Sequence, residues 1–193
     1  MSLEIKKRNH LLRIYRISVD CQKRLLYTER KKEVTVMLVF TDLNGERVEL
    51  TFGPNERGIA ARHVLLLCKH QEKWLCTKHR RRGIEFPGGK AEEGESIEVA
   101  IKREVYEETG VTIHNVQQFA EYVVHTEEPF CKAVFTAEIA EIAEDYTLHE
   151  TEGAVWLTTE ALDHEEHISF YMKDEGMIAL RKWVEQYASE RKN

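Results

Sequence analysis

The stretch that decides the fold reads Gly89-Lys-Ala-Glu-Glu-Gly-Glu95-Ser-Ile-Glu-Val-Ala-Ile-Lys-Arg103-Glu104-Val-Tyr-Glu107-Glu108-Thr-Gly110-Val111. It predicts a helix from about 97 to 109, because Ser96 suits the N-cap and Gly110 suits the position just after the last turn. On this helix three glutamates lie at i, i+3 and i+4, so they share one side. The same side carries apolar residues in its first half. The helix is therefore apolar at its beginning and densely anionic at its end.

The three glutamates are Glu104, Glu107 and Glu108, and their placement lowers the stability of the helix. Glu104 and Glu108 repel each other by about 0.2–0.5 kcal/mol, and carboxylates near the negative end of a helix dipole cost about 0.3–1 kcal/mol each. Mg²⁺ prefers carboxylate oxygens and completes its coordination with water and phosphate oxygens. The cluster predicts a Mg²⁺–phosphate site, and the alternative is the solvated charged face common on helices.

The complete string resembles the Nudix box, whose pattern fixes residue types at nine positions. Those positions are Gly89, Glu95, Arg103, Glu104, Val105, Glu107, Glu108, Gly110 and Val111, without insertion. The resemblance implies an α/β/α sandwich, a mixed β-sheet between helices. It implies that Glu104, Glu107 and Glu108 are metal ligands, with one of them orienting or deprotonating the attacking water. It further implies an ion pair between Arg103 and Glu95, and a backbone carbonyl of Gly89 on the metal, which is Mg²⁺ or alternatively Mn²⁺.

The preceding segment, Glu85-Phe86-Pro87-Gly88-Gly89-Lys90, resembles the MutT type of Nudix enzyme, which acts on nucleoside triphosphates. By this resemblance, Lys90 contacts a substrate phosphate. A phosphate-binding P-loop is excluded because Ala91 stands where Ser or Thr is required. Further motifs are Arg82-Gly83-Ile-Glu-Phe-Pro87, His149-Glu150-Thr151 and Phe170-Tyr171-Met172-Lys173-Asp174. By these motifs the chain resembles the bacillar YtkD group from about Met37 to its end. That similarity implies activity on 8-oxo-dGTP and other nucleoside triphosphates, and on triphosphorylated RNA 5′ ends.

Enzymes of the MutT type also use a catalytic carboxylate from a later loop. Glu150 is the candidate, with Glu152 as the second choice and a solvated loop acid as the alternative. Phe86, His167 and Phe170 are candidates for contact with a purine base, although aromatic residues at such positions are often part of the core.

The rest of the chain predicts strands interspersed with helices. Strands are expected over 34–40, 47–52, 63–68, 73–77, 116–125, 130–139 and 154–157, and a second helix over 169–188. The first two strands form a hairpin at Asn44-Gly45, and the next two form one near Gln71-Glu72. Strands before, between and after helices indicate a mixed sheet covered by helices on both faces.

Composition indicates one globular domain: 42% of the 193 residues are hydrophobic and 32% are charged. Residues 1–36 carry ten Lys/Arg against four Asp/Glu, a charge of +6. Because the net charge of the chain is −6, residues 37–193 carry −12. One hypothesis is that residues 1–36 are translated upstream sequence and that Met37 is the native start. The alternative is a genuine basic extension preceding a Nudix domain at 37–193.

The sequence favours a cytoplasmic protein. It has four scattered cysteines, no apolar run long enough to cross a bilayer and no secretory signal.

The expected activity is hydrolysis of a nucleoside triphosphate, (8-oxo-)dGTP or a related nucleotide, to a monophosphate and pyrophosphate. One alternative is removal of pyrophosphate from RNA 5′ ends, and another is hydrolysis of a dinucleoside polyphosphate or nucleotide sugar. A non-catalytic nucleotide sensor is an alternative of a different class, and it would be expected to carry a broken box. The expected partners are the nucleotide substrate and RNA 5′ ends, with no membrane; the sequence leaves the oligomeric state open.

Overall fold

The computed structural model describes residues 26–30, 33–53, 59–148 and 150–190. Its main sheet has seven strands in the order β1-β2-β3-β9-β10-β4-β8. Their bounds are β1 Leu26–Arg30, β2 Glu33–Thr41, β3 Arg47–Phe52, β9 Val111–His125, β10 Phe130–Ile142, β4 Ala61–Leu66 and β8 Gly88–Lys90. Only the pair β10–β4 is parallel among these neighbours. The sheet is therefore mixed, as the sequence predicts.

A second, antiparallel sheet has the strand order β11-β6-β5, and β7 also pairs with β6. These strands are β11 Thr151–Leu157, β6 Lys73–His79, β5 Lys69–His70 and β7 Gly83–Glu85. The short connection between β7 and β8 is Phe86-Pro87, so the chain passes from the small sheet to the edge of the large sheet within a few residues. This connection places the glycine segment at the edge of the large sheet.

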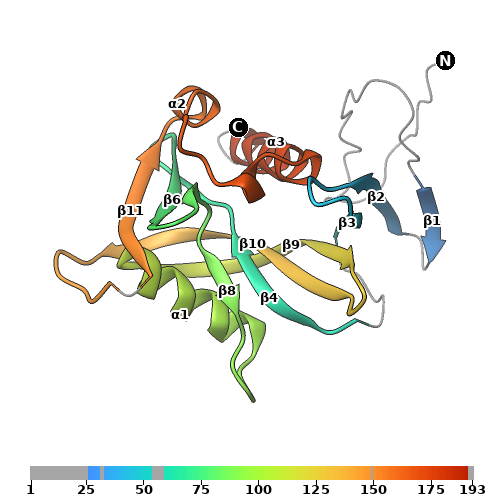
Figure 1. Cartoon of the computed structure of the whole chain (residues 1–193), viewed down its shortest axis with the longest axis horizontal. Coiled ribbons are helices and arrows are strands. Elements are labelled where there is room, and N and C mark those ends of the chain that lie inside the picture. The colour runs from blue at the N-terminus through green and yellow to red at the C-terminus, as the bar shows by residue number, and fades with distance from the viewer. Residues whose placement is uncertain (1–25, 31–32, 54–58, 149, 191–193) are drawn as a thin grey trace.

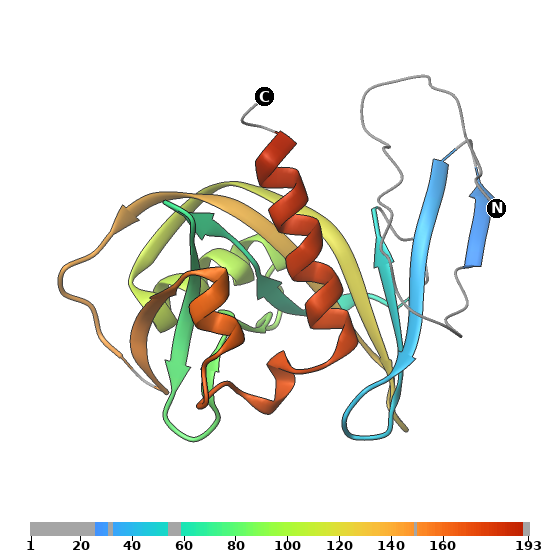
Figure 2. The same ribbon diagram turned by 90° about the horizontal axis from the view of Figure 1, so that it is seen from above.

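Helices cover both faces of the seven-stranded sheet (Figure 1). Helix α1, Ile97–Thr109, lies on one face, and α3, Glu175–Glu190, lies on the other. Figure 2 shows α3 lying across the strands when the molecule is seen from above. A short helix α2, Thr159–Asp163, and a 3₁₀ turn η1, Phe170–Met172, connect β11 to α3. No helix in the described part of the chain is long and apolar enough to cross a membrane.

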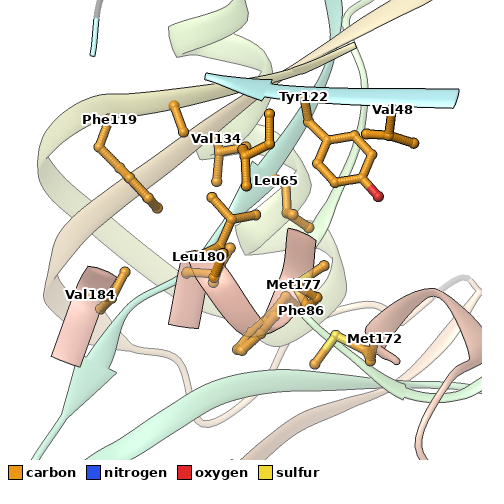
Figure 3. Packing of buried hydrophobic residues seen from close by; sticks show 14 of the residues in the cluster. Val48, Leu65, Phe86, Phe119, Tyr122, Val134, Met172, Met177, Leu180 and Val184 are labelled. Atoms are coloured by element: carbon orange, nitrogen blue, oxygen red, sulfur yellow. The ribbon is translucent and has the colours of Figure 1, made fainter. Parts of the chain in front are cut away.

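Alternation along the strands divides the core into two clusters, one on each face of the sheet. Val64 and Leu66 belong to the cluster under α1, together with Ile101 and Val105 of the helix. Leu65 belongs to the cluster under α3. In Figure 3, Leu65, Val134 and Tyr122 project from the sheet toward Met177 and Leu180 of α3. This period of two is what a strand buried on both faces requires.

Two predicted elements are wrong in part. The second hairpin does turn at Gln71-Glu72, both with positive φ, but only β5 pairs with β6 there. Residues 61–66 instead join the large sheet between β10 and β8. The last helix begins at Glu175 rather than near 169, because the Asp174 carboxylate accepts the Met177 N–H at 2.7 Å and caps the helix.

The remaining predicted strands are present, 47–52 with the same bounds and the others with longer ones, and β1 was not expected from the sequence. Residues 1–25 and 31–32 lie outside the described residues. Strand β2 begins at Glu33, before Met37, and pairs with β1 in the register Leu26↔Met37. In β2, burial is described from Met37 onward, and Met37, Leu38 and Phe40 are buried. The hypothesis that Met37 is the native start remains a prediction.

Candidate active site

Both ends of α1 are fixed by the side chains and backbone groups that the sequence suggests. The Ser96 hydroxyl accepts the Val99 N–H, and Gly110 ends the helix at φ 68°. The carbonyl of Glu108, which has no partner within the helix, accepts the hydroxyl of Thr151 at 2.9 Å and of Thr77 at 3.2 Å. The anionic end of the helix is therefore tied to β6 and β11 in the second sheet.

The glycine strand β8 lies directly against the glutamates of α1. The Gly88 N–H donates to Glu108 Oε2 at 3.0 Å, and the Lys90 N–H donates to Glu104 Oε1 at 3.1 Å. A Cβ at Gly89 would lie 2.2 Å from the carboxyl carbon of Glu104. Position 89 therefore requires glycine for close approach, and two of the three glutamates are held at the edge of the sheet.

Arg103 joins the loop before the helix to the helix itself. Its guanidinium makes a two-pronged ion pair with Glu95, at 3.0 and 2.8 Å, and donates to the Lys90 carbonyl at 3.1 Å. It also lies 3.1 Å from Glu104 and from Glu107. The hydrogen bonds from Arg103, with a backbone N–H from Glu92, lower the pKa of Glu95 to about 2. The expected ion pair between Arg103 and Glu95 is present.

Glu108 is the most perturbed of the three glutamates. Burial is the largest cause that raises its pKa to about 8; the negative charges of Glu104 and Glu85 contribute to this shift, and the Gly88 N–H opposes it. Glu85 is held by Arg82 through bonds of 3.2, 3.1 and 2.5 Å. Sequence reasoning gave Glu85 and Arg82 no role. Their spacing of three residues and their position before the glycine segment were the available signal.

The carboxylates suit a divalent cation, although each of them has a protein partner in this conformation. Among the described residues, no three acidic, histidine or cysteine side chains converge closely enough to hold a metal ion. Glu107 is exposed and paired with Arg103, whereas Glu104 and Glu108 accept backbone N–H groups of β8. The charge of Glu104 raises the pKa of Glu108, and a cation between them would relieve that repulsion. The donor set thus fits Mg²⁺ or Mn²⁺, which take carboxylate and carbonyl oxygens.

The two candidates for a further catalytic carboxylate, Glu150 and Glu152, differ in their surroundings. Glu150 is exposed, its carbonyl accepts the Arg80 N–H, and the next residue, Thr151, bonds the carbonyl of Glu108. Glu150 therefore lies beside the end of α1 that carries the glutamates. Glu152 forms an exterior ion pair with Lys78 at 2.5 Å. This difference favours Glu150 over Glu152, and its catalytic role stays a prediction.

The three aromatic candidates for base contact differ in their exposure. Phe86 is 3% exposed and packs edge-on against Trp74 at 5.4 Å between ring centroids. It is a core residue, so the expectation that it binds the nucleotide is not retained. His167 is exposed, and its carbonyl accepts the Ile84 N–H. Phe170 is exposed beside Tyr171 in η1.

Comparison with known proteins gives consistent results. The family model described as NUDIX domain matches residues 55–178. The Bacillus subtilis protein YtkD, provisionally described as an 8-oxo-dGTP diphosphatase, is 35% identical over 77% of this chain and 100% of its own. The crystal structure of the Bacillus subtilis pyrophosphohydrolase BsRppH is 34% identical, with a TM-score of 0.69 over 77% of this chain and 96% of that one. An RNA pyrophosphohydrolase of Caulobacter vibrioides is 50% identical over 52 residues, 25% of this chain and 30% of its own.

Proposed function

This chain belongs to the Nudix family of hydrolases, and we propose that it is a Mg²⁺-dependent enzyme that cuts nucleoside triphosphates to a monophosphate and pyrophosphate. Its proposed preferred substrates are 8-oxo-dGTP and dGTP. The likeness over most of the chain to YtkD, described as an 8-oxo-dGTP diphosphatase, supports this substrate class. Mn²⁺ is the alternative metal, since it accepts the same oxygen ligands.

The single observation that carries the proposal is the contact of the glutamate helix with the glycine strand. Glu104 and Glu108 stand against Gly88–Lys90 at hydrogen-bond distance. Burial and mutual repulsion raise the pKa of Glu108 to about 8. Close, poorly solvated carboxylates lower the stability of the folded protein when no cation is bound. A cation-binding site needs such carboxylates, whereas a solvated helix face does not.

In the proposed mechanism, Glu104, Glu107 and Glu108 would hold the metal together with the Gly89 carbonyl. The bound cation would neutralise phosphate charge and lower the pKa of the attacking water. Arg103 keeps the loop and helix in register through Glu95 and the Lys90 carbonyl. Lys90 contacts a substrate phosphate, and Glu150 accepts a proton from the water. Catalysis then depends mainly on position and charge, as in other phosphoryl transfers.

A substrate panel with product identification tests the proposal. The panel holds 8-oxo-dGTP, dGTP, a dinucleoside polyphosphate and a nucleotide sugar, each with Mg²⁺, with Mn²⁺ and with EDTA. We expect metal-dependent release of monophosphate and pyrophosphate from the triphosphates, and ³¹P NMR in ¹⁸O-labelled water locates the phosphorus attacked. Glu104→Gln is expected to lower kcat by orders of magnitude, and Glu98→Gln, which changes an exposed glutamate of the same helix, is the matched control. Turnover that is unaffected by EDTA would refute the metal dependence.

A second candidate activity is removal of pyrophosphate from RNA 5′ ends. It is favoured by the likeness to BsRppH over 96% of that chain, which is named as a pyrophosphohydrolase. Relative kcat/KM on 8-oxo-dGTP and on a short triphosphorylated RNA discriminates between the two. The non-catalytic sensor is disfavoured because every fixed position of the box is filled.

We also propose that the enzyme works in the reducing cytoplasm. Cys68, Cys76 and Cys131, the described cysteines, are free and buried. Burial raises the pKa of each of these thiols to about 12, so none of them is a reactive thiolate. Labelling of thiols in intact cells before and after lysis would detect a different redox state.

A further inference from the structure

Three basic side chains form a row across the edge of the seven-stranded sheet. His63 on β4 is paired with Lys132 on β10 and, on its other side, with Lys90 on β8. Residues directly opposite each other in neighbouring strands project to the same face and lie within a few ångströms. We call Lys132, His63 and Lys90 the basic row.

The basic row lies on the face of the sheet that α3 covers further along. Leu65 and Val134, two positions after His63 and Lys132 on the same strands, project into the core under α3 (Figure 3). Gly89 faces Glu104 of α1, so Lys90, the next residue, projects to the opposite face. The glutamates and the basic row therefore meet from opposite faces at strand β8.

The basic row is electrostatically unfavourable in the free protein. A protonated His63 would stand directly opposite two lysines, and like charges in that arrangement destabilise a sheet. Burial lowers the pKa of His63, and so do the charges of Lys132, Lys90 and Arg62. Lys132 is half-buried, and burial lowers the pKa of its ammonium. Keeping Lys132 charged therefore lowers the stability of the folded protein, whereas a fully solvated lysine would not have this effect.

The neighbouring carboxylates form no ion pair with the Lys132 ammonium in the described part of the chain. Within the part of the chain that the structure describes, no hydrogen bond or ion pair joins Lys132 to another residue; its ammonium lies 6.0 Å from the centre of the Tyr122 ring. Asp174 attracts it but already accepts the Tyr122 hydroxyl and the Met177 N–H. Glu85 also attracts it but is bound by Arg82. An external anion is the partner that this lysine lacks.

We propose that the basic row binds the polyphosphate chain of the substrate, with Lys132 and His63 as binding residues in addition to Lys90. This inference rests on the proposed function. The row spans two interstrand spacings, about 10 Å, and begins at β8 beside the glutamates. A linear polyphosphate along it would have one end at Glu104 and Glu108 and would extend toward Tyr122.

Binding of inorganic tripolyphosphate to the metal-free, full-length protein tests the inference without turnover. Calorimetric titrations in EDTA compare the wild type with Lys132→Gln, His63→Gln and Lys182→Gln, which removes an exposed charge on α3. We expect Lys132→Gln to weaken binding about tenfold, the loss of one charge-assisted contact. Binding by the Lys182→Gln protein should match the wild type. Equal affinities for the wild type and both row variants would overturn the proposal.

Stability separates a binding residue from a structural one. Lys132→Met should keep or raise the midpoint of thermal unfolding while weakening tripolyphosphate binding, because it removes a poorly solvated charge. A structural lysine would show the reverse, a lower midpoint with unchanged affinity, and that result would also refute the row. If the wild type hydrolyses nucleotides but the row variants bind tripolyphosphate as tightly as the wild type, the proposed role of the row is refuted and the proposed function is not. Tripolyphosphate binding that depends on Lys132, in a protein that hydrolyses no nucleotide, supports the row and refutes the proposed function.

Discussion

Replacing Glu108 by glutamine should stabilise the metal-free protein while it abolishes hydrolysis. Burial and the charges of Glu104 and Glu85 raise the pKa of Glu108 from 4.5 to about 8, so the folded protein holds a proton that the unfolded chain releases. The free energy of unfolding therefore falls as the pH rises through the window from 4.5 to 8. At 1.36 kcal/mol per pH unit, the loss is about 1 kcal/mol at pH 5 and about 4 kcal/mol at pH 8. Glutamine mimics the protonated carboxyl and avoids this loss.

The measurement is urea unfolding in EDTA at pH 5 and pH 8, followed by tryptophan fluorescence. We expect the Glu108→Gln protein to exceed the wild type by about 1 kcal/mol at pH 5 and about 4 kcal/mol at pH 8. Saturating Mg²⁺ at pH 8 should stabilise the wild type more than the variant, because only the wild type offers the full set of carboxylates. Turnover of the variant should be lower by orders of magnitude.

Glu107→Gln is the matched control, since Glu107 is exposed and paired with Arg103. Its effect on the free energy of unfolding should stay within about 0.5 kcal/mol and show no gain at pH 8. The reasoning about Glu108 fails if Glu108→Gln is no more stable than the wild type at pH 8. It also fails if the gain is the same at both pH values, because a gain from packing alone would not titrate.

Three further predictions concern the site. Gly89→Ala places a methyl group 2.2 Å from the Glu104 carboxyl carbon, so kcat should fall at least about tenfold with an unchanged far-ultraviolet circular dichroism spectrum; a wild-type kcat would contradict the close approach. Arg103→Lys keeps the charge but loses the fork that grips Glu95, and steady-state kinetics should show kcat reduced about tenfold. Glu150→Gln should reduce kcat by about a hundredfold whereas Glu152→Gln should leave it near normal, and the opposite ranking would transfer the proton-accepting role to Glu152.

The helix and its immediate loop were predictable because their signals are local. The bounds of α1 are set by its own flanking residues, Ser96 and Gly110, and the structure places both caps as expected. The turn at Gln71-Glu72 was found for the same reason. The error in the second hairpin has a different origin. The apolar run Val64–Leu66 favours a strand, but no local signal shows that this strand pairs with β10, which follows more than sixty residues later.

The fate of Phe86 shows why aromatic residues near a site are hard to interpret from sequence. An apolar ring next to a glycine segment suits base stacking and core packing equally well, and only the position of Trp74 decides for the core. The start of α3 was misjudged for a comparable reason. Ser169 and Asp174 are both suitable N-caps, but Asp174 takes the role while the backbone of Ser169 bonds Ile84.

The basic row could not be predicted from the sequence. Lys132, His63 and Lys90 come from three strands, so their proximity arises only from register. In an acidic chain of net charge −6, such a row is not a general means of attracting anions. It stands at β8, where the opposite face presents Glu104 and Glu108. The crowded carboxylates on one face and the poorly solvated Lys132 ammonium on the other each lower the stability of the free protein, and a metal-bound polyphosphate would neutralise both. Departures from local stability are expected where function requires them, and here two such departures share one strand.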